Sequence, residues 1–128
     1  MAWNIEFTDD FGTWWDSLSE DEQITIRAKV VLLEKHGPTL SRPHADVIHG
    51  SRYQNLKELR AQHNGRPYRV LFIFDPKRTG VLLIGGDKTG DNRWYEEYVP
   101  RAEKIYVSYL AETGQSGETA IPHGIKSS

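Results

Sequence analysis

The sequence predicts one α+β domain with the element order β-α-α-β-β-β-α. Three observations predict it. A capping box opens a helix in the first third of the chain, an Asn-Gly turn separates two strand-like segments in the middle, and helical periodicity returns near the end. A chain of 128 residues suits a single core. We therefore expect a small mixed sheet, with two helices on one face and the C-terminal helix at its end or on the other face.

The first third of the chain predicts a strand followed by a helical hairpin. Residues 3–7 alternate apolar and polar side chains, which indicates a half-buried strand, and Thr8 can cap a short helix. A capping box from Ser19 to Glu22 opens a second helix, which Gly37-Pro38 ends. The residues at helical spacing in this helix are Ile24, Ala28, Val31, Leu32 and Lys35.

The remainder predicts three strands and a final helical region. Residues 39–54 lack a period and indicate a long surface loop with a short turn near 45–48. The predicted strands span residues 55–62, 68–74 and 81–84, and residues 85–90 form an exit loop. Helices are expected at 91–98 and 100–112, with a break at Pro100. Residues 1–112 would form the domain, and 113–128 have the composition of a flexible tail.

The charges are distributed unevenly. Residues 42–93 hold ten Lys or Arg against five acids, whereas the rest of the chain holds six against thirteen. A basic middle within an acidic frame favours a local anion site. Basic sheet edges that serve only solubility are the alternative.

The cations of this middle region are candidates for a phosphate site, because a guanidinium fork binds phosphate oxygens in a bidentate manner. If the strands are neighbours, Lys88 comes close to the hairpin. The alternative is that these side chains only pair with acids or lie along the sheet edge. The candidates are Lys57, Arg60, Arg66, Arg69, Lys88 and Arg93.

Other chemistries find little support. The chain has no cysteine and no legible Ser-His-Asp arrangement, and the spacing of His44, Asp46 and His49 matches no common metal pattern, so we expect no metal and no cofactor. His63, at the predicted turn, is a candidate for proton transfer to RNA. Trp94 is expected in the core, and Tyr95 lies on another face of its helix.

No apolar run approaches a membrane span and no signal peptide is visible, so we expect a cytoplasmic protein. The chemistry that remains is one without a protein nucleophile. RNA cleavage meets this condition, because the substrate's 2′-hydroxyl attacks its own phosphate and the protein supplies alignment, proton transfer and charge stabilisation.

The segments NLKELR, GRPYRVLFIFDP and VLLIGGDKTGDNRWYEEYVPRAEKIY occur in this order. Together they resemble the RelE/ParE toxin superfamily of bacterial type II toxin–antitoxin modules, and most of all its phage-related, HigB-like branch. The resemblance covers roughly residues 3–112. It implies a RelE-like fold and a ribosome-dependent mRNA endonuclease that inhibits translation. It also implies a cognate antitoxin, in this branch commonly a helix-turn-helix protein, and the ribosome and mRNA as further partners.

The resemblance also assigns roles to particular residues. Arg60 stands where the family often has a basic residue ending its second strand, and Arg69 stands in the family's Tyr-Arg pair. Lys88 occupies the basic position after the last strand, and Tyr95 matches an aromatic that stacks on substrate or helps in proton transfer. The resemblance implies RNA-backbone contacts for Lys57 and Arg66. Glu58 departs from the pattern, since some relatives carry a lysine there.

Two other functions remain open. A ParE-like toxin on the same fold would inhibit DNA gyrase by binding alone, and a degenerate toxin would retain only antitoxin or nucleic-acid binding. Fold does not separate these possibilities. The basic cluster favours the endonuclease.

Overall fold

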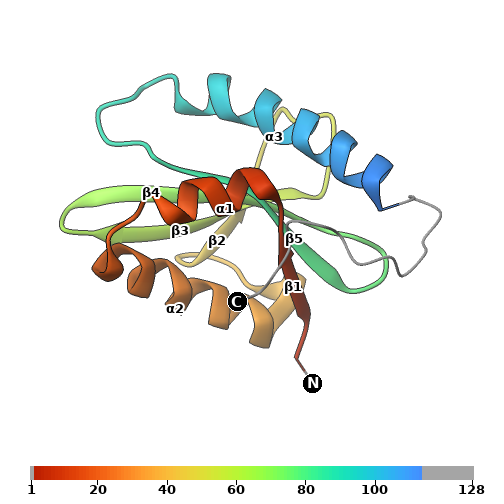
Figure 1. Ribbon diagram of the computed structural model, residues 1–128, viewed down its shortest axis with the longest axis horizontal. Coiled ribbons are helices and arrows are strands. Elements are labelled where there is room, and N and C mark those ends of the chain that lie inside the picture. The colour runs from red at the N-terminus through yellow and green to blue at the C-terminus, as the bar shows by residue number, and fades with distance from the viewer. Residues whose placement is uncertain (1, 114–128) are drawn as a thin grey trace.

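The computed structural model describes residues 2–113 and has an α+β architecture of five strands and three α-helices (Figure 1). The expected fold class is confirmed. The elements are β1 (Asn4–Phe7), α1 (Asp9–Asp16), α2 (Glu20–His36), a 3-10 turn η1 (Gly37–Thr39), β2 (Ala45–Val47), β3 (Leu56–His63), β4 (Arg66–Phe74), β5 (Thr79–Asp87) and α3 (Trp94–Glu112).

The strands form one sheet in the order β1-β5-β4-β3-β2. β3, β4 and β5 are a meander of antiparallel neighbours, and β2 pairs antiparallel with β3 at one edge. β1 closes the other edge and runs parallel to β5, with Asn4 opposite Thr79. The sheet is therefore mixed, as the sequence predicts.

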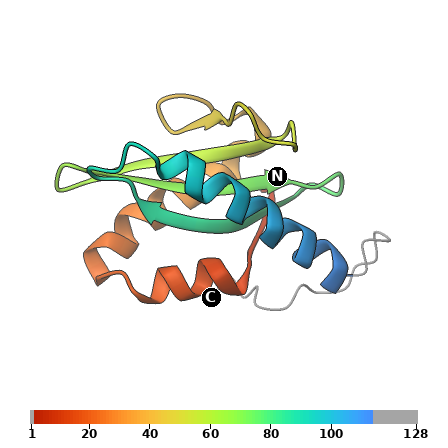
Figure 2. The same cartoon turned by 90° about the horizontal axis from the view of Figure 1, so that it is seen from above.

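The sheet is covered on both faces (Figures 1 and 2). The helical hairpin of α1 and α2 packs on one face, where Phe11, Ile26 and Leu33 meet strand residues such as Tyr68 and Phe72. Helix α3 crosses the opposite face, on a second apolar cluster. That cluster includes Leu56, Leu71, Leu83, Trp94, Ala102, Tyr106 and Tyr109. Of the two places expected for the last helix, the structure selects the opposite face.

The turn between β3 and β4 follows the predicted Asn-Gly signal. Asn64 and Gly65 both have positive φ angles, 52° and 78°, as a two-residue hairpin turn requires. This turn places the residues before and after it directly opposite one another, from His63 and Arg66 back to Leu56 and Ile73.

Two features of the sheet were not predicted. Residues 45–47, expected as a turn within a loop, form the short strand β2, because they find hydrogen-bonding partners along the free edge of β3. Gly85 and Gly86, expected in an exit loop, belong to β5. They stay in the strand because Trp14 packs against Gly85 and Trp94 packs against Gly86, where a β-carbon would collide with either ring.

The break expected at Pro100 is wrong, since α3 runs unbroken through it. Proline removes the hydrogen bond to the carbonyl four residues earlier, but Pro100 and Glu96 both lie on the exposed side of α3, where water can satisfy that carbonyl. The buried Ala102, Tyr106 and Tyr109 hold the helix on the sheet beyond this point.

The apolar face expected for α2 is also corrected. Ile26 and Leu33 are its buried residues, whereas Ile24 and Val31 are 62% and 51% exposed. Thr113 is the last described residue, so the expected tail lies almost wholly outside the described residues. No helix within residues 2–113 is long and apolar enough to cross a membrane.

Candidate functional site

Two arginines face each other on the sheet surface that carries α3. Arg60 of β3 and Arg69 of β4 are direct partners in the antiparallel register. Like charges directly opposite one another on a sheet repel, so this pairing needs a counter-charge. The Arg69 side chain is only 8% exposed, while that of Arg60 is 28% exposed and reaches the surface.

Glu58 supplies that counter-charge. It lies two residues before Arg60 and therefore on the same face of β3. Its Oε2 accepts a hydrogen bond from Arg60 Nη1 at 2.9 Å, and its Oε1 lies 3.4 Å from Arg69 Nε. The carboxylate is buried, with 3% of the residue exposed. One buried acid thus bridges both guanidinium groups.

Tyr95, in the first turn of α3, contacts this group from the helix that packs on the sheet. Its hydroxyl donates to Glu58 Oε1 at 2.7 Å and accepts from Arg69 Nε at 3.3 Å. Burial and then the hydrogen bond to Glu58 raise the pKa of Tyr95 above its usual value. At neutral pH its hydroxyl therefore keeps its proton.

Lys88 completes the cluster from the loop after β5. Its backbone N–H donates to the Pro67 carbonyl at 2.9 Å, which ties the loop to the start of β4. Its Nζ lies 5.5 Å from the centroid of the Tyr95 ring, within cation–π range. The proximity of Lys88 to the hairpin, expected from the sequence, is present.

These five side chains form what we call the arginine cluster, namely Glu58, Arg60, Arg69, Lys88 and Tyr95. Three cations against one carboxylate leave a surplus of positive charge at the edge of α3. Such an arrangement can bind a phosphate group and stabilise charge that develops on it. The four residues predicted as catalytic lie together here.

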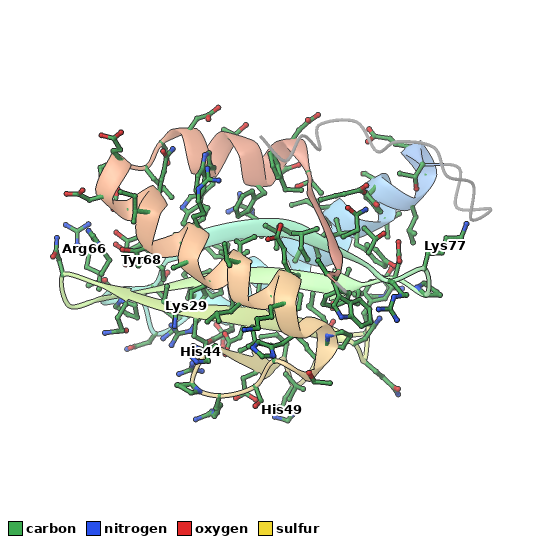
Figure 3. The ribbon with its side chains drawn as sticks, turned by 90° about the horizontal axis from the view of Figure 1, so that it is seen from below. Lys29, His44, His49, Arg66, Tyr68 and Lys77 are labelled. Carbon is green, nitrogen blue, oxygen red and sulfur yellow. The ribbon has the colours of Figure 1, made fainter. Side chains whose placement is uncertain are left out.

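The other predicted RNA contacts lie elsewhere. Arg66 sits at the β3–β4 turn, 3.6 Å from Asp87, and can be seen at one end of the sheet in Figure 3. Arg93 is exposed before α3 and pairs with Glu96 at 2.8 Å. Arg66 is the register partner of His63 and lies three positions before Arg69, so it is on the face of β4 that carries Tyr68, away from the arginine cluster. No interaction joins Arg93 to a member of the cluster within the part of the chain that the structure describes.

Lys57 and His63 lie on the opposite face of the sheet. Lys57 Nζ donates to the Pro38 carbonyl at 2.8 Å, and His63 Nδ1 is 2.8 Å from the hydroxyl of Thr25 on α2. The structure therefore does not bring these two residues to the arginine cluster. The alternation of side chains along β3 explains this, since both differ from Arg60 by an odd number of positions.

Glu58 is the residue that sequence reasoning missed. The resemblance marks it only as a departure from the family pattern, whereas its position two residues before Arg60 places it on the same strand face. The histidine-rich loop, in contrast, gives no metal site. His44 Nδ1 meets Lys29 Nζ at 2.9 Å (Figure 3), and no group of metal ligands occurs among the residues described.

Comparison with known proteins now identifies the family. The profile described as "Phage derived protein Gp49-like (DUF891)" matches residues 13–107, most of the chain. The chain belongs to the Gp49-like family. The match spans α2, the whole meander and most of α3, so it includes every member of the arginine cluster.

Relatives of this Gp49-like chain include two Mycobacterium tuberculosis proteins named as toxins. HigB3 is 40% identical over 105 residues, covering 81% of this chain and 90% of HigB3. HigB2 is 33% identical over 114 residues, covering 88% of this chain but only 56% of HigB2. These matches confirm the predicted HigB-like branch.

A solved structure of a mutant of the E. coli toxin RelE in the free state shares the fold. The TM-score is 0.56 at 16% sequence identity, and the match covers 79% of this chain and 98% of that one. The predicted RelE-like fold is confirmed. At this identity the likeness concerns the fold alone.

Proposed function

We propose that this Gp49-like protein is the toxin of a type II toxin–antitoxin module and acts as a ribosome-dependent mRNA endonuclease. The observation that carries the proposal is the arginine cluster, where Arg60, Arg69 and Lys88 converge beside Tyr95 at the α3 edge of the sheet. Membership of a family with relatives named HigB3 and HigB2 toxins supports the assignment as a toxin.

The proposed reaction uses the nucleophile that RNA itself contains. The 2′-oxygen loses its proton and forms a bond to the neighbouring phosphorus, while the bond from phosphorus to the 5′-oxygen breaks and that oxygen takes up a proton. The products are a 2′,3′-cyclic phosphate and a 5′-hydroxyl. Arg69 and Arg60 bind the phosphate oxygens and stabilise the extra negative charge of the pentacoordinate transition state. The ribosome would hold the mRNA in the geometry for in-line attack.

Mutation of Arg69 tests this proposal. The wild type and Arg69→Ala are induced in cells, and the 5′ ends of mRNA are mapped. We expect cleavage in phase with codons in the wild type and a loss of roughly 100-fold or more in the variant, as for removal of one transition-state donor. Arg69→Lys is included because it retains the charge but loses the planar fork, and we expect it to remain strongly impaired.

Lys77→Ala is the matched control. Lys77 is an exposed cation in the β4–β5 turn, at the end of the sheet away from Arg66 (Figure 3), so its removal should leave cleavage unchanged. Growth arrest with intact mRNA and an SOS response would instead support gyrase inhibition. Absence of any effect of the wild type would indicate a degenerate toxin.

The partners and location follow from this function. A cognate antitoxin, which we expect to be a helix-turn-helix protein, would neutralise the toxin in the cytoplasm, where mRNA and ribosomes meet. Co-expression of the antitoxin should restore growth to cells that produce the wild-type toxin. The residue expected to extend the RNA contact from the arginine cluster is the exposed Arg93, whereas Arg66 could contact RNA only at the β3–β4 end of the sheet, from the other face.

A further inference from the structure

Glu58 is an acidic residue placed where a phosphate would bind. A free carboxylate there would repel an anionic substrate, yet this one is buried to 3% exposure, accepts hydrogen bonds from Arg60 and Tyr95, and forms an ion pair with Arg69. We propose that Glu58 is a positioning residue that holds Arg60, Arg69 and the Tyr95 hydroxyl in the phosphate-binding arrangement and does not itself contact RNA. This inference rests on the proposed function.

The sheet register explains why a positioning residue is needed. Arg60 and Arg69 are direct cross-strand partners, so their backbones hold the two guanidinium groups side by side regardless of their repulsion. Glu58 lies diagonal to Arg69 and on the same face as Arg60, within 3.4 Å of the first and 2.9 Å of the second. Without its charge, repulsion between the two guanidinium groups would shift them out of alignment with one phosphate, although both would remain in the cluster as cations that attract RNA.

Glu58 also links the sheet to α3. The Tyr95 hydroxyl donates to Glu58 at 2.7 Å and accepts from Arg69 at 3.3 Å, so three elements, β3, β4 and α3, meet at this point. The direction of these bonds fixes the phenolic proton on the side of Glu58. Tyr95 therefore presents its oxygen to Arg69, so that the Tyr95 hydroxyl and Glu58 Oε1 meet Arg69 Nε from the same side.

The same contacts argue against Glu58 as the general base. A base must reach the 2′-hydroxyl proton, but both oxygens of Glu58 are turned toward protein donors, with Oε1 accepting from Tyr95 and Oε2 from Arg60. The Arg60 side chain, paired with this carboxylate, is the more exposed of the two at 28%. Glu58 acts through its neighbours.

Glu58→Gln tests the inference, because it retains the shape of the side chain and removes the charge. The matched control is Glu97→Gln, which removes an exposed carboxylate of α3 whose nearest ion-pair partner, Arg101, is 3.9 Å away. Two properties are measured on purified proteins that remain folded by circular dichroism. They are turnover in ribosome-dependent cleavage and the Kd for a short single-stranded RNA.

We expect Glu58→Gln to lower turnover by about tenfold to 100-fold, as for misplaced catalytic groups. Its Kd for RNA should stay equal or fall, because the cluster gains one positive charge. Loss of turnover together with weaker RNA binding would overturn the inference, since that pattern indicates a direct contact or a collapsed site. Unchanged turnover would overturn it as well. Glu97→Gln should change neither property.

A third measurement does not depend on RNA cleavage. The Tyr95 hydroxyl is titrated by ultraviolet absorbance of tyrosinate, as the difference between each protein and its Tyr95→Phe counterpart. Loss of the Glu58 charge should lower the pKa of Tyr95, since that charge helps to raise it. An unchanged titration would show that Glu58 does not hold Tyr95. If the wild type cleaves no RNA, the proposed function fails, while this titration and RNA binding still decide the role of Glu58.

Discussion

Addition of a single methyl group to β5 should separate the stability of this protein from the RNA cleavage proposed for it. Gly85 and Gly86 are adjacent, so their missing side chains point to opposite faces of the sheet. A β-carbon at Gly86 would lie 2.8 Å from Nε1 of Trp94, and one at Gly85 would lie 2.4 Å from a ring carbon of Trp14. Gly86→Ala and Gly85→Ala therefore overpack different faces.

The geometry gives the size of the effect. Ordinary contact begins at 3.4 Å, so the Trp94 ring must retreat by at least about 0.6 Å in Gly86→Ala, and overpacking of this kind costs about 1–3 kcal/mol. Trp94 directly precedes Tyr95 at the start of α3. The displacement therefore moves the Tyr95 hydroxyl off its bonds of 2.7 and 3.3 Å in the arginine cluster. A misplacement near 1 Å can cost about 100-fold in rate.

The free energy of unfolding is measured by urea denaturation with tryptophan fluorescence, and cleavage is measured per folded molecule. Both variants should lose stability, but only Gly86→Ala should lose cleavage activity, by about tenfold to 100-fold. Gly85→Ala is the control on the other face, against α1. Full activity per folded molecule in Gly86→Ala, or an equal loss in Gly85→Ala, would refute the reasoning.

Two further predictions concern the dependence of stability on pH. Burial raises the pKa of Glu6 above 4.5, despite a hydrogen bond from Tyr109. The folded state therefore keeps the Glu6 proton to higher pH than the unfolded state does. Stability falls as pH rises from the unfolded-state pKa of Glu6 through its folded-state pKa. Glu6→Gln should remove this fall in urea titrations carried upward from pH 4.5, and a persisting fall would contradict it. On the face that carries α1 and α2, the Tyr68 hydroxyl donates a hydrogen bond to Glu22 and lowers the pKa of that carboxyl. The bond therefore stabilises the folded state near neutral pH, and this stabilisation is lost as pH falls through the folded-state pKa of Glu22. Tyr68→Phe should cost about 1 kcal/mol at pH 7 and less at pH 3, and an equal cost at both values would speak against this bond.

The elements that the sequence predicted best are those with local causes. The capping box forms as expected, since Ser19 accepts from the Glu22 backbone and Glu22 accepts from the Ser19 backbone. The turn at Asn64 and Gly65 likewise depends on the conformations those two residues adopt. In each case the determinant lies within a few residues of the element.

The elements that the sequence did not predict depend on distant partners. Strand β2 exists because Ala45 and Val47 find the edge of β3, and α3 continues past Pro100 because its buried face is held by the sheet. The two exposed apolar residues of α2, Ile24 and Val31, fit a helical period as well as the buried ones do, so periodicity alone could not choose the face.

The candidate site divides in the same way. Period-two alternation along β3 would have placed Glu58 beside Arg60 and excluded Lys57 and His63, so this part was available from the sequence. The convergence of Lys88 and Tyr95 with Arg69 needed the packing of α3 onto the sheet. The five residues of the arginine cluster come from four separate segments of the chain, and the fold brings these segments together.

The pairing of β1 with β5 has a consequence for synthesis of the protein. The first strand lies at one edge of the sheet, and its only sheet partner among the described residues is the last strand, with Asn4 opposite Thr79. Contacts so distant in sequence form slowly, because a long loop must close first. A growing chain cannot complete its sheet until β5 has emerged from the exit tunnel, and Tyr95 follows later still. The arginine cluster therefore assembles only after almost the whole domain has been translated.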